Sequence, residues 1–313
     1  MQPELNQQKV NTEWESEHFD LLKKEQVNEA IALKLQRLPK SLYRYRSLLS
    51  GYDLENIKNQ QFYLAHPDEM NDPYESAFTW DYRKLSDDVL KDDRIWEMKR
   101  GFYGTLSEAE ISRIRGAKDS QQEILKIVEE KNPNSVGLTL MDSLLTQLAE
   151  EQGKMMQQKL EKQVKDGIKF CCFSSRNDSI LMWSHYANQH KGICVEYNFD
   201  QYHLKNSLYP VHYSEQVTDI GSYLVRKEPS MIVPVLAVVQ KALDWQYEKE
   251  WRLAITHGIM DKNFIYSPRP VAIYMGARIA AEDREKVMAL CSELGIPTVQ
   301  MTKDLQAFRI SPA

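Results

Sequence analysis

The sequence contains no apolar run long enough to cross a membrane. The longest such run, Ile232 to Val239, has about eight residues and includes Pro234, whereas a spanning helix needs roughly 20. The first residues, Met1 to Phe19, are polar and acidic, unlike a signal or transit peptide. We therefore expect a cytoplasmic protein with no membrane partner.

Cysteine is scarce, with four residues in a chain of 313. So few cysteines do not make a disulfide framework, and buried free thiols are the expected state. No two of them stand in a CxxC pattern; Cys171 and Cys172 are directly adjacent. Because structural zinc sites rely on such pairs, no metal is expected on this evidence.

Glycine-rich phosphate motifs and an excess of basic residues are also missing. None of the 12 glycines falls in a GxGxxG or P-loop pattern, so neither a Rossmann dinucleotide site nor a P-loop is supported. Lysine and arginine number 40 against 45 acidic residues, which gives a formal net charge of -5. The protein as a whole therefore presents no basic field to nucleic acid or to an anionic membrane.

What is present is the composition of a folded protein, with 42% hydrophobic and 27% charged residues. Helical spacing of apolar residues predicts helices at Glu13 to Leu38, Leu54 to Asn59 (with Asp53 as N-cap), Met231 to Leu243 and Ala281 to Leu294. Alternating or short apolar runs predict strands at Ser41 to Arg46, Phe62 to Ala65, Ile168 to Ser174, Gly192 to Tyr197, Leu208 to Tyr213, Trp251 to Thr256, Val271 to Met275 and Thr298 to Met301.

This order favours an α+β fold with a split, mixed or antiparallel sheet, because no regular βαβ alternation occurs. Between Trp80 and Asp166 the chain is charged, rich in Gln and Glu, and periodic in Leu, Ile and Val. We therefore expect an N-terminal helical segment (1–40), a first part of the α+β core (41–79), a helical insertion (80–167) and a second part of the core (168–313).

Polar and aromatic residues concentrate in the first half of the expected core. Arg44 and Arg46 share one face of their strand, Tyr43 and Tyr45 the other, and two guanidiniums on one face suit a diphosphate or a carboxylate. The turn that contains Asn71 and Asp72 follows a strand, where functional loops are often held. The alternatives are a solvated surface strand and an ordinary Asx-rich turn.

The second half of the expected core contains three further candidate segments. Ser174 ends a strand, where it either orients a ligand or caps the following helix. Trp183, His185, Tyr186 and His190 precede a strand; the two histidines are five residues apart, the wrong interval for two metal ligands on one helical face.

The third segment is Glu248-Lys-Glu250, followed by Arg252. In a strand the two carboxylates share a face, where they raise one another's pKa or stabilise a developing cation. The alternative is a charged edge strand.

These residues resemble a bacterial family catalogued as domain of unknown function 2971. The matching pieces run from about residue 41 to 277 and are Leu42 to Arg46, Asn71 to Glu75, Cys172 to Ser174, Met182 to Ala187, His190 to Glu196, Trp245 to Arg252 and Ile273 to Gly276. The resemblance names no reaction.

A looser resemblance is to bacterial ADP-ribosyltransferases of the Arg-Ser-Glu type. Arg46 (or Arg44), Ser174 and the pair Glu248 and Glu250 occur in the order that this type requires. The resemblance implies that NAD is the substrate and that Arg46 binds its diphosphate. It also implies that Glu250 stabilises the oxocarbenium-like transition state, while Glu248 positions or deprotonates the acceptor. The segment Phe173-Ser-Ser175 stands in place of the usual Ser-Thr-Ser and lacks its threonine, and the gap from Arg46 to Ser174 is 128 residues.

The resulting hypothesis is an NAD-dependent ADP-ribosyltransferase or NAD glycohydrolase, in the manner of a toxin or phage-defence effector, with a protein or nucleic-acid acceptor. Its site is assigned to Glu250, Glu248 and His185 as catalytic residues. The expected ligand-binding residues are Arg46, Arg44, Tyr45, Ser174, Asn71, Asp72, Trp183, Tyr186 and Arg252.

Two alternatives stay open. One is a hydrolase or nuclease built on His185, His190, Asp72 and Glu250, which in its metal-dependent form needs these side chains around one ion. The other is a non-catalytic module that binds a nucleotide or anion through Arg44, Arg46, Trp183 and Tyr186.

Overall fold

The computed structural model describes residues 10–81, 95, 106–131, 138–224, 230–256 and 262–313. It divides into two compact units, which we describe separately. Unit 1 comprises residues 1–77, 164–216 and 234–313, and unit 2 comprises 78–163 and 217–233. Residues 217–233 were expected in the second part of the core (168–313). The boundaries expected for the four segments of the chain stay predictions.

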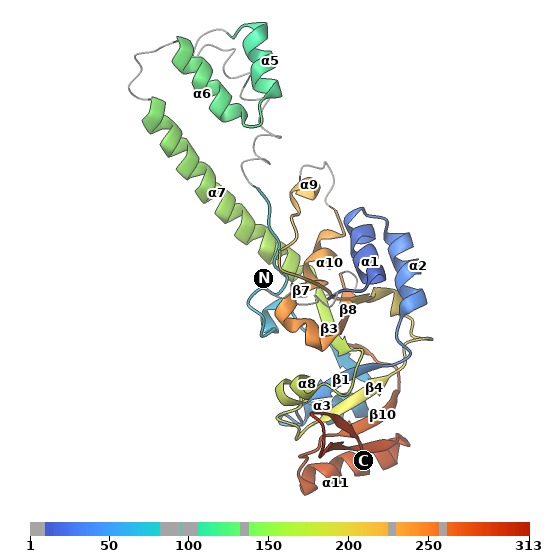
Figure 1. Ribbon diagram of the computed structural model, residues 1–313. Helices are drawn as coiled ribbons and strands as arrows, with labels where there is room; N and C mark the ends of the chain where they lie inside the picture. Colours follow the sequence, from blue (N-terminus) through green and yellow to red (C-terminus); the bar gives the residue numbers. More distant parts are fainter. Residues whose placement is uncertain (1–9, 82–94, 96–105, 132–137, 225–229, 257–261) are drawn as a thin grey trace, which may run out of the picture. The chain divides into compact units, whose positions relative to one another are not determined.

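An eight-stranded mixed sheet forms the centre of unit 1 (Figure 1), in the order β12-β11-β10-β4-β1-β3-β8-β5. Only β10 and β11 pair in parallel within it; the other neighbours are antiparallel. The strands are β1 (Leu42–Arg46), β3 (Lys169–Ser174), β4 (Ile193–Tyr197), β5 (Leu208–Pro210), β8 (Glu250–Ile255), β10 (Pro270–Met275), β11 (Thr298–Lys303) and β12 (Ile310–Pro312). The arrangement confirms the expected α+β fold with a mixed sheet.

Two short sheets adjoin this one. In the first, β2 (Gln61–Tyr63) pairs antiparallel with β9 (Phe264–Tyr266). In the second, β6 (His212–Ser214) pairs in parallel with β7 (Gln240–Ala242), which the sequence predicted as part of a helix. The helix in that region, α10 (Val233–Val238), ends earlier, and β7 brings Lys241 into unit 1.

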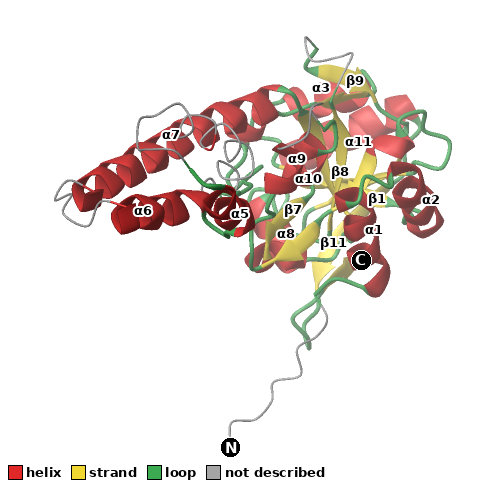
Figure 2. Cartoon of the chain, turned by 90° about the horizontal axis from the view of Figure 1, so that it is seen from above, coloured by secondary structure: helices red, strands yellow, loops and turns green. Residues whose placement is uncertain are grey.

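Helices lie on both sides of the strands (Figure 2). They are α1 (Glu13–Lys23), α2 (Val27–Arg37), α3 (Tyr52–Lys58), α8 (Ile180–His185) and α11 (Ala281–Leu294), with 3-10 turns η1 (Pro67–Glu69), η2 (Lys205–Ser207) and η3 (Leu243–Glu248). No helix among the described residues has the length and apolar character needed to cross a membrane.

The sheet carries an apolar core on each face. On one face, Leu42, Phe173 and Leu253 pack with Ile57 of α3 and Val287 of α11. On the other, Tyr45 and Cys194 pack under Met182 and Trp183 of α8. Successive residues of β1 therefore point to opposite faces, as pleating requires.

Unit 2 contains α5 (Glu108–Gly116), α6 (Ser120–Lys131), most of α7 (Leu138–Asp166) and α9 (Gly221–Leu224). Its apolar cluster joins Ile95 to Ile111, Ile114 and Ile127. A single bridge between Thr79 and Asp219 ties its two chain segments together.

Two local predictions differ from the structure, and Glu248 and Glu250 do not lie on one strand. The helix expected from Glu13 to Leu38 is two helices, because Glu25 takes a left-handed conformation (φ 58°) between α1 and α2. Gly51 is the N-cap of α3, while Asp53 is instead paired with Arg46. The segment Trp245 to Glu248 is a 3-10 turn, and the strand begins only at Glu250.

Two glycines lie where their main chain passes another segment of the chain too closely for a side chain. A Cβ on Gly192 would come 2.0 Å from the Arg46 carbonyl oxygen, and one on Gly276 would come 2.2 Å from that of His190. We expect Gly192→Ala to lower the free energy of unfolding by at least about 3 kcal/mol, since backbone atoms must move apart.

Urea denaturation measures this effect. Gly116→Ala is the control, because no atom lies within 4 Å of the added methyl group there. A Gly192→Ala variant as stable as Gly116→Ala would contradict the close approach.

Candidate functional site

A cavity of about 500 Å³ lies between β1 and β3. These strands pair at one position, Tyr43 with Ser174; at the other end of β3, Phe170 is bridged by Ala65 instead of by β1. Residues from both faces of each strand line the space, from Tyr43 to Arg46 and from Phe170 to Ser174. The cavity is therefore a gap in the sheet, and its volume lies within the roughly 300–1,000 Å³ of small-molecule sites.

One wall of the cavity is a buried network of charged side chains. Arg252 donates to both oxygens of Glu75, at 2.6 and 2.9 Å, and its Nε donates to Glu250 at 2.8 Å. Lys241 lies between the two glutamates of the ExE segment, 2.5 Å from Glu248 and 3.3 Å from Glu250. All five side chains are at most 5% exposed, so the network is shielded from water.

Neutral groups complete the network. Tyr186 donates its hydroxyl to Glu248 Oε1 at 2.6 Å. Burial and the neighbouring Glu250 raise the pKa of the Cys172 thiol, which stays neutral. Ser174 donates its hydroxyl to the main-chain carbonyl of Glu248 at 2.5 Å. Ser174 therefore fixes the turn that carries Glu248. The following helix, α8, is capped by Ser179 instead, so the capping role predicted for Ser174 is wrong.

The surroundings of Glu248 and Glu250 shift the pKa values of their two carboxylates in opposite directions. Burial and the neighbouring Glu250 raise the pKa of Glu248 above its ordinary value. Although burial opposes it, the charges of Arg252 and Lys241 lower the pKa of Glu250 to about 2. Two nearby carboxylates with opposed pKa shifts are typical of acid–base sites, because one stays ionised while the other exchanges a proton near neutral pH.

The two arginines of β1 differ in their partners. Arg46 forms an ion pair of 3.2 Å with Asp53, whose carboxylate also lies in the field of Arg44. Arg44 donates to the Tyr63 carbonyl oxygen at 3.3 Å and lies near the rings of Phe62 and Phe173, with no carboxylate within 4 Å among the described residues. Arg44 is therefore the better anchor for an anionic group.

Most of the residues that the sequence singled out meet at this cavity. It is lined by Arg44, Tyr45, Arg46, Asn71, Ser174, His185, Tyr186, Glu248, Glu250 and Arg252.

Asp72 and Trp183 do not line it. Asp72 accepts from the Tyr74 amide as a turn residue, and the buried Trp183 ring packs on Tyr45 and donates to the Asn177 carbonyl.

The metal hypothesis finds no support in the geometry. Within the described ranges, no three His, Cys, Asp or Glu side chains are arranged to hold an ion. His190 lies in a left-handed turn (φ 68°), where its Nε2 contacts the Ser184 hydroxyl at 3.1 Å. This position gives His190 a local structural role.

Two members of the network were missed by sequence reasoning. Glu75 was noted only as the end of the segment Asn71 to Glu75, and Lys241 lies in a segment that was predicted to be helical. A buried lysine is identified by the residues that surround it in the folded protein, and no spacing in the sequence indicates which residues these are. An acidic residue at the end of a conformationally restricted turn, by contrast, was a usable signal for Glu75.

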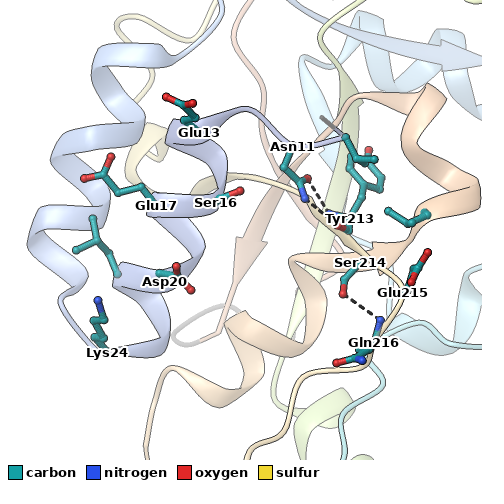
Figure 3. Close-up of a pocket in the computed structure, with 13 residues that line it drawn as sticks. Asn11, Glu13, Ser16, Glu17, Asp20, Lys24, Tyr213, Ser214, Glu215 and Gln216 are labelled. Atoms are coloured by element: carbon teal, nitrogen blue, oxygen red, sulfur yellow. Dashed lines mark hydrogen bonds between the residues drawn. The ribbon is translucent and has the colours of Figure 1, made fainter. Parts of the chain in front are cut away.

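A second cavity, larger and more open, lies between α1 and residues 213–216 (Figure 3). Glu17 and Asp20 of α1 face it, and Asn11 is joined to the main chain of Tyr213 by two hydrogen bonds of 2.8 and 3.0 Å. Asp20 pairs with Lys23 at 3.3 Å, but both side chains are about half exposed, unlike the buried network around Glu248. The smaller cavity is therefore the better candidate despite its size.

Comparison with known proteins gives one match. Residues 182–253 match the model of a family described as "Protein of unknown function (DUF2971)". This supports the expected resemblance over a segment shorter than 41 to 277, and the segment contains Tyr186, Lys241, Glu248, Glu250 and Arg252. No curated protein and no solved structure matches the chain.

Proposed function

We propose that the cavity binds NAD+ and cleaves the bond between its nicotinamide and ribose, as an NAD glycohydrolase or ADP-ribosyltransferase. The observation that carries the proposal is the pair Glu248 and Glu250, with opposed pKa shifts, in one cavity with Arg44. The shared cavity matters because cleavage needs both a phosphate anchor and a carboxylate near the reacting carbon.

In this reaction nicotinamide leaves with the electron pair of the C–N bond, and an oxocarbenium-like ribosyl cation develops. Water or an acceptor group attacks that carbon and gives its proton to Glu248. Its raised pKa makes the carboxylate of Glu248 a stronger base than an ordinary glutamate.

Glu250 acts differently from what the resemblance implies. Its oxygens accept three hydrogen bonds from Arg252 and Lys241. Those of Glu248 accept one from Lys241 and one from Tyr186, so Glu248 has more capacity left for a substrate contact. Glu250 stabilises the developing positive charge through its field and keeps Lys241 in place. In this proposal Glu248 therefore acts directly on the reacting groups, and Glu250 acts through its charge.

The test is nicotinamide release from NAD+ by the purified chain, with and without cell lysate as a source of protein and nucleic-acid acceptors. We expect Arg44→Gln to raise KM about tenfold, since a charge-assisted phosphate contact is lost. Arg46→Gln, the matched control, should raise KM less, because Arg46 already forms an ion pair with Asp53. Absence of release with and without lysate would overturn the proposal.

A non-catalytic nucleotide-binding module is the second candidate. It is favoured by the ion pairs of Glu250 with Arg252 and Lys241, which hold this carboxylate in a structural network. Tight binding of NAD+ with no release of nicotinamide, in the same samples, would select it.

A further inference from the structure

The charges of the buried network do not balance. It holds three carboxylates, from Glu75, Glu248 and Glu250, and two cations, from Lys241 and Arg252, all at most 5% exposed. With every group ionised, one negative charge is left without compensation. An unbalanced buried charge is costly, so this end of the cavity favours either a proton or a positively charged ligand.

The surplus charge falls on Glu248. Arg252 binds both Glu75 and Glu250, and Lys241 is shared between Glu250 and Glu248. In the part of the chain that the structure describes, Lys241 is the one basic group within 4 Å of Glu248. The other partner of Glu248 is the neutral hydroxyl of Tyr186.

Among the described residues, the elements around Glu248 contribute mainly uncharged groups, together with His185 of α8, whose ring lies 6.3 Å from that of Tyr247. η3 contributes Trp245, whose ring lies 4.5 Å from the Lys241 ammonium, and Tyr247, while β3 contributes the neutral Cys172. The pleat of β1 sends Arg44 to the face opposite Tyr43, whereas Tyr43, Ser174 and Glu250 form a cross-strand row on one face. The cavity is thus polarised, with Arg44 on one side and the surplus carboxylate on the other.

We propose that the Glu248 end of the cavity is a subsite for a positively charged group of the ligand, which binds against the ionised carboxylate and displaces its proton to solvent. The inference rests on the proposed function for the ligand: the pyridinium ring of NAD+ is such a group. Binding of the cation and release of the proton are then linked at one carboxylate.

Oxidised and reduced nicotinamide rings test the subsite, because they have similar shapes and differ by one positive charge. The probe is carba-NAD+, in which a methylene group replaces the ring oxygen of the nicotinamide ribose and blocks cleavage, together with its reduced form. We expect the oxidised form to bind at least about tenfold more tightly, since only it supplies the missing charge.

Isothermal titration calorimetry at pH 5.5 and 7.5, each in two buffers of different ionisation enthalpy, gives affinities and protons released. The preference for the oxidised form should increase with pH, and its binding should release more protons at pH 5.5 than at pH 7.5, because more of Glu248 is protonated at the lower pH. Glu248→Gln should bring the two affinities within about twofold and abolish proton release. Glu196→Gln is the control: it removes a carboxylate of β4, held by Tyr274 and outside the cavity lining, and should preserve the preference.

Equal affinities for the two forms in the native chain, or failure to bind either, would overturn the subsite. An unchanged preference in Glu248→Gln would do the same. A native chain that prefers the oxidised form but never releases nicotinamide from NAD+ would remove the proposed reaction and leave the subsite standing.

Discussion

Arg252→Met is expected to lower the free energy of unfolding by about 3–5 kcal/mol, because it leaves buried carboxylates without their counter-charge. The guanidinium is 1% exposed and binds both oxygens of Glu75, both of Glu250 and the Val238 carbonyl. Methionine fills much of the same volume, so the loss reports charge and hydrogen bonding more than packing. Urea denaturation followed by circular dichroism gives the value.

Lys58→Met is the control for loss of an ion pair. Lys58 lies 2.9 Å from Glu293, but both side chains are more than half exposed, and such pairs contribute at most about 1 kcal/mol. Adding Glu75→Gln to Arg252→Met should recover part of the stability, since one of the stranded charges is then removed. A single Arg252→Met variant no less stable than Lys58→Met would show that the network is not closed as described.

Glu248→Gln should lower kcat for nicotinamide release by about 100-fold or more, with the fold retained. A general base contributes about 10²–10⁴ in rate, and an amide accepts no proton. The substitution keeps an oxygen for the Tyr186 hydroxyl and leaves Lys241 paired with Glu250. The measurement is steady-state release of nicotinamide, with thermal unfolding as the check on folding.

The pH profile separates this role from a structural one. As a base Glu248 must be ionised, so activity should fall as pH drops through its raised pKa. The Glu248→Gln variant should lose that acidic limb, whereas Glu196→Gln should keep both rate and profile. A Glu248→Gln enzyme with the native rate would exclude general-base catalysis by this residue.

The elements that sequence predicted well are those whose local pattern decides the structure. The strand at Leu42–Arg46 and the helix Ala281–Leu294 follow from alternation and helical spacing that no tertiary contact opposes. Prediction failed where single residues adopt left-handed conformations. Glu25 breaks one expected helix, and Lys249, with φ 45°, separates the 3-10 turn from β8.

The candidate site was predictable in part for a related reason. Residues close together in the chain, such as Glu248 and Glu250, form a pattern that the sequence shows directly, and both line the cavity. Partners brought in by other elements do not: Glu75 lies 177 residues from Arg252, and Lys241 arrives on a strand read as helix. The pairing of Arg46 with Asp53, which shifts the anion anchor to Arg44, also depended on structure.

The gap between β1 and β3 limits the size of a ligand through the main chain and not through side chains. Its width is set by the spacing of two main chains, which are held at Tyr43–Ser174 on one side and Ala65–Phe170 on the other. Substitutions of side chains that line the gap therefore change the chemical groups that contact a ligand. They have much less effect on the size of ligand that fits. Selection for a bulkier compound would have to act on strand pairing, whereas a new functional group can be accommodated by one exchange.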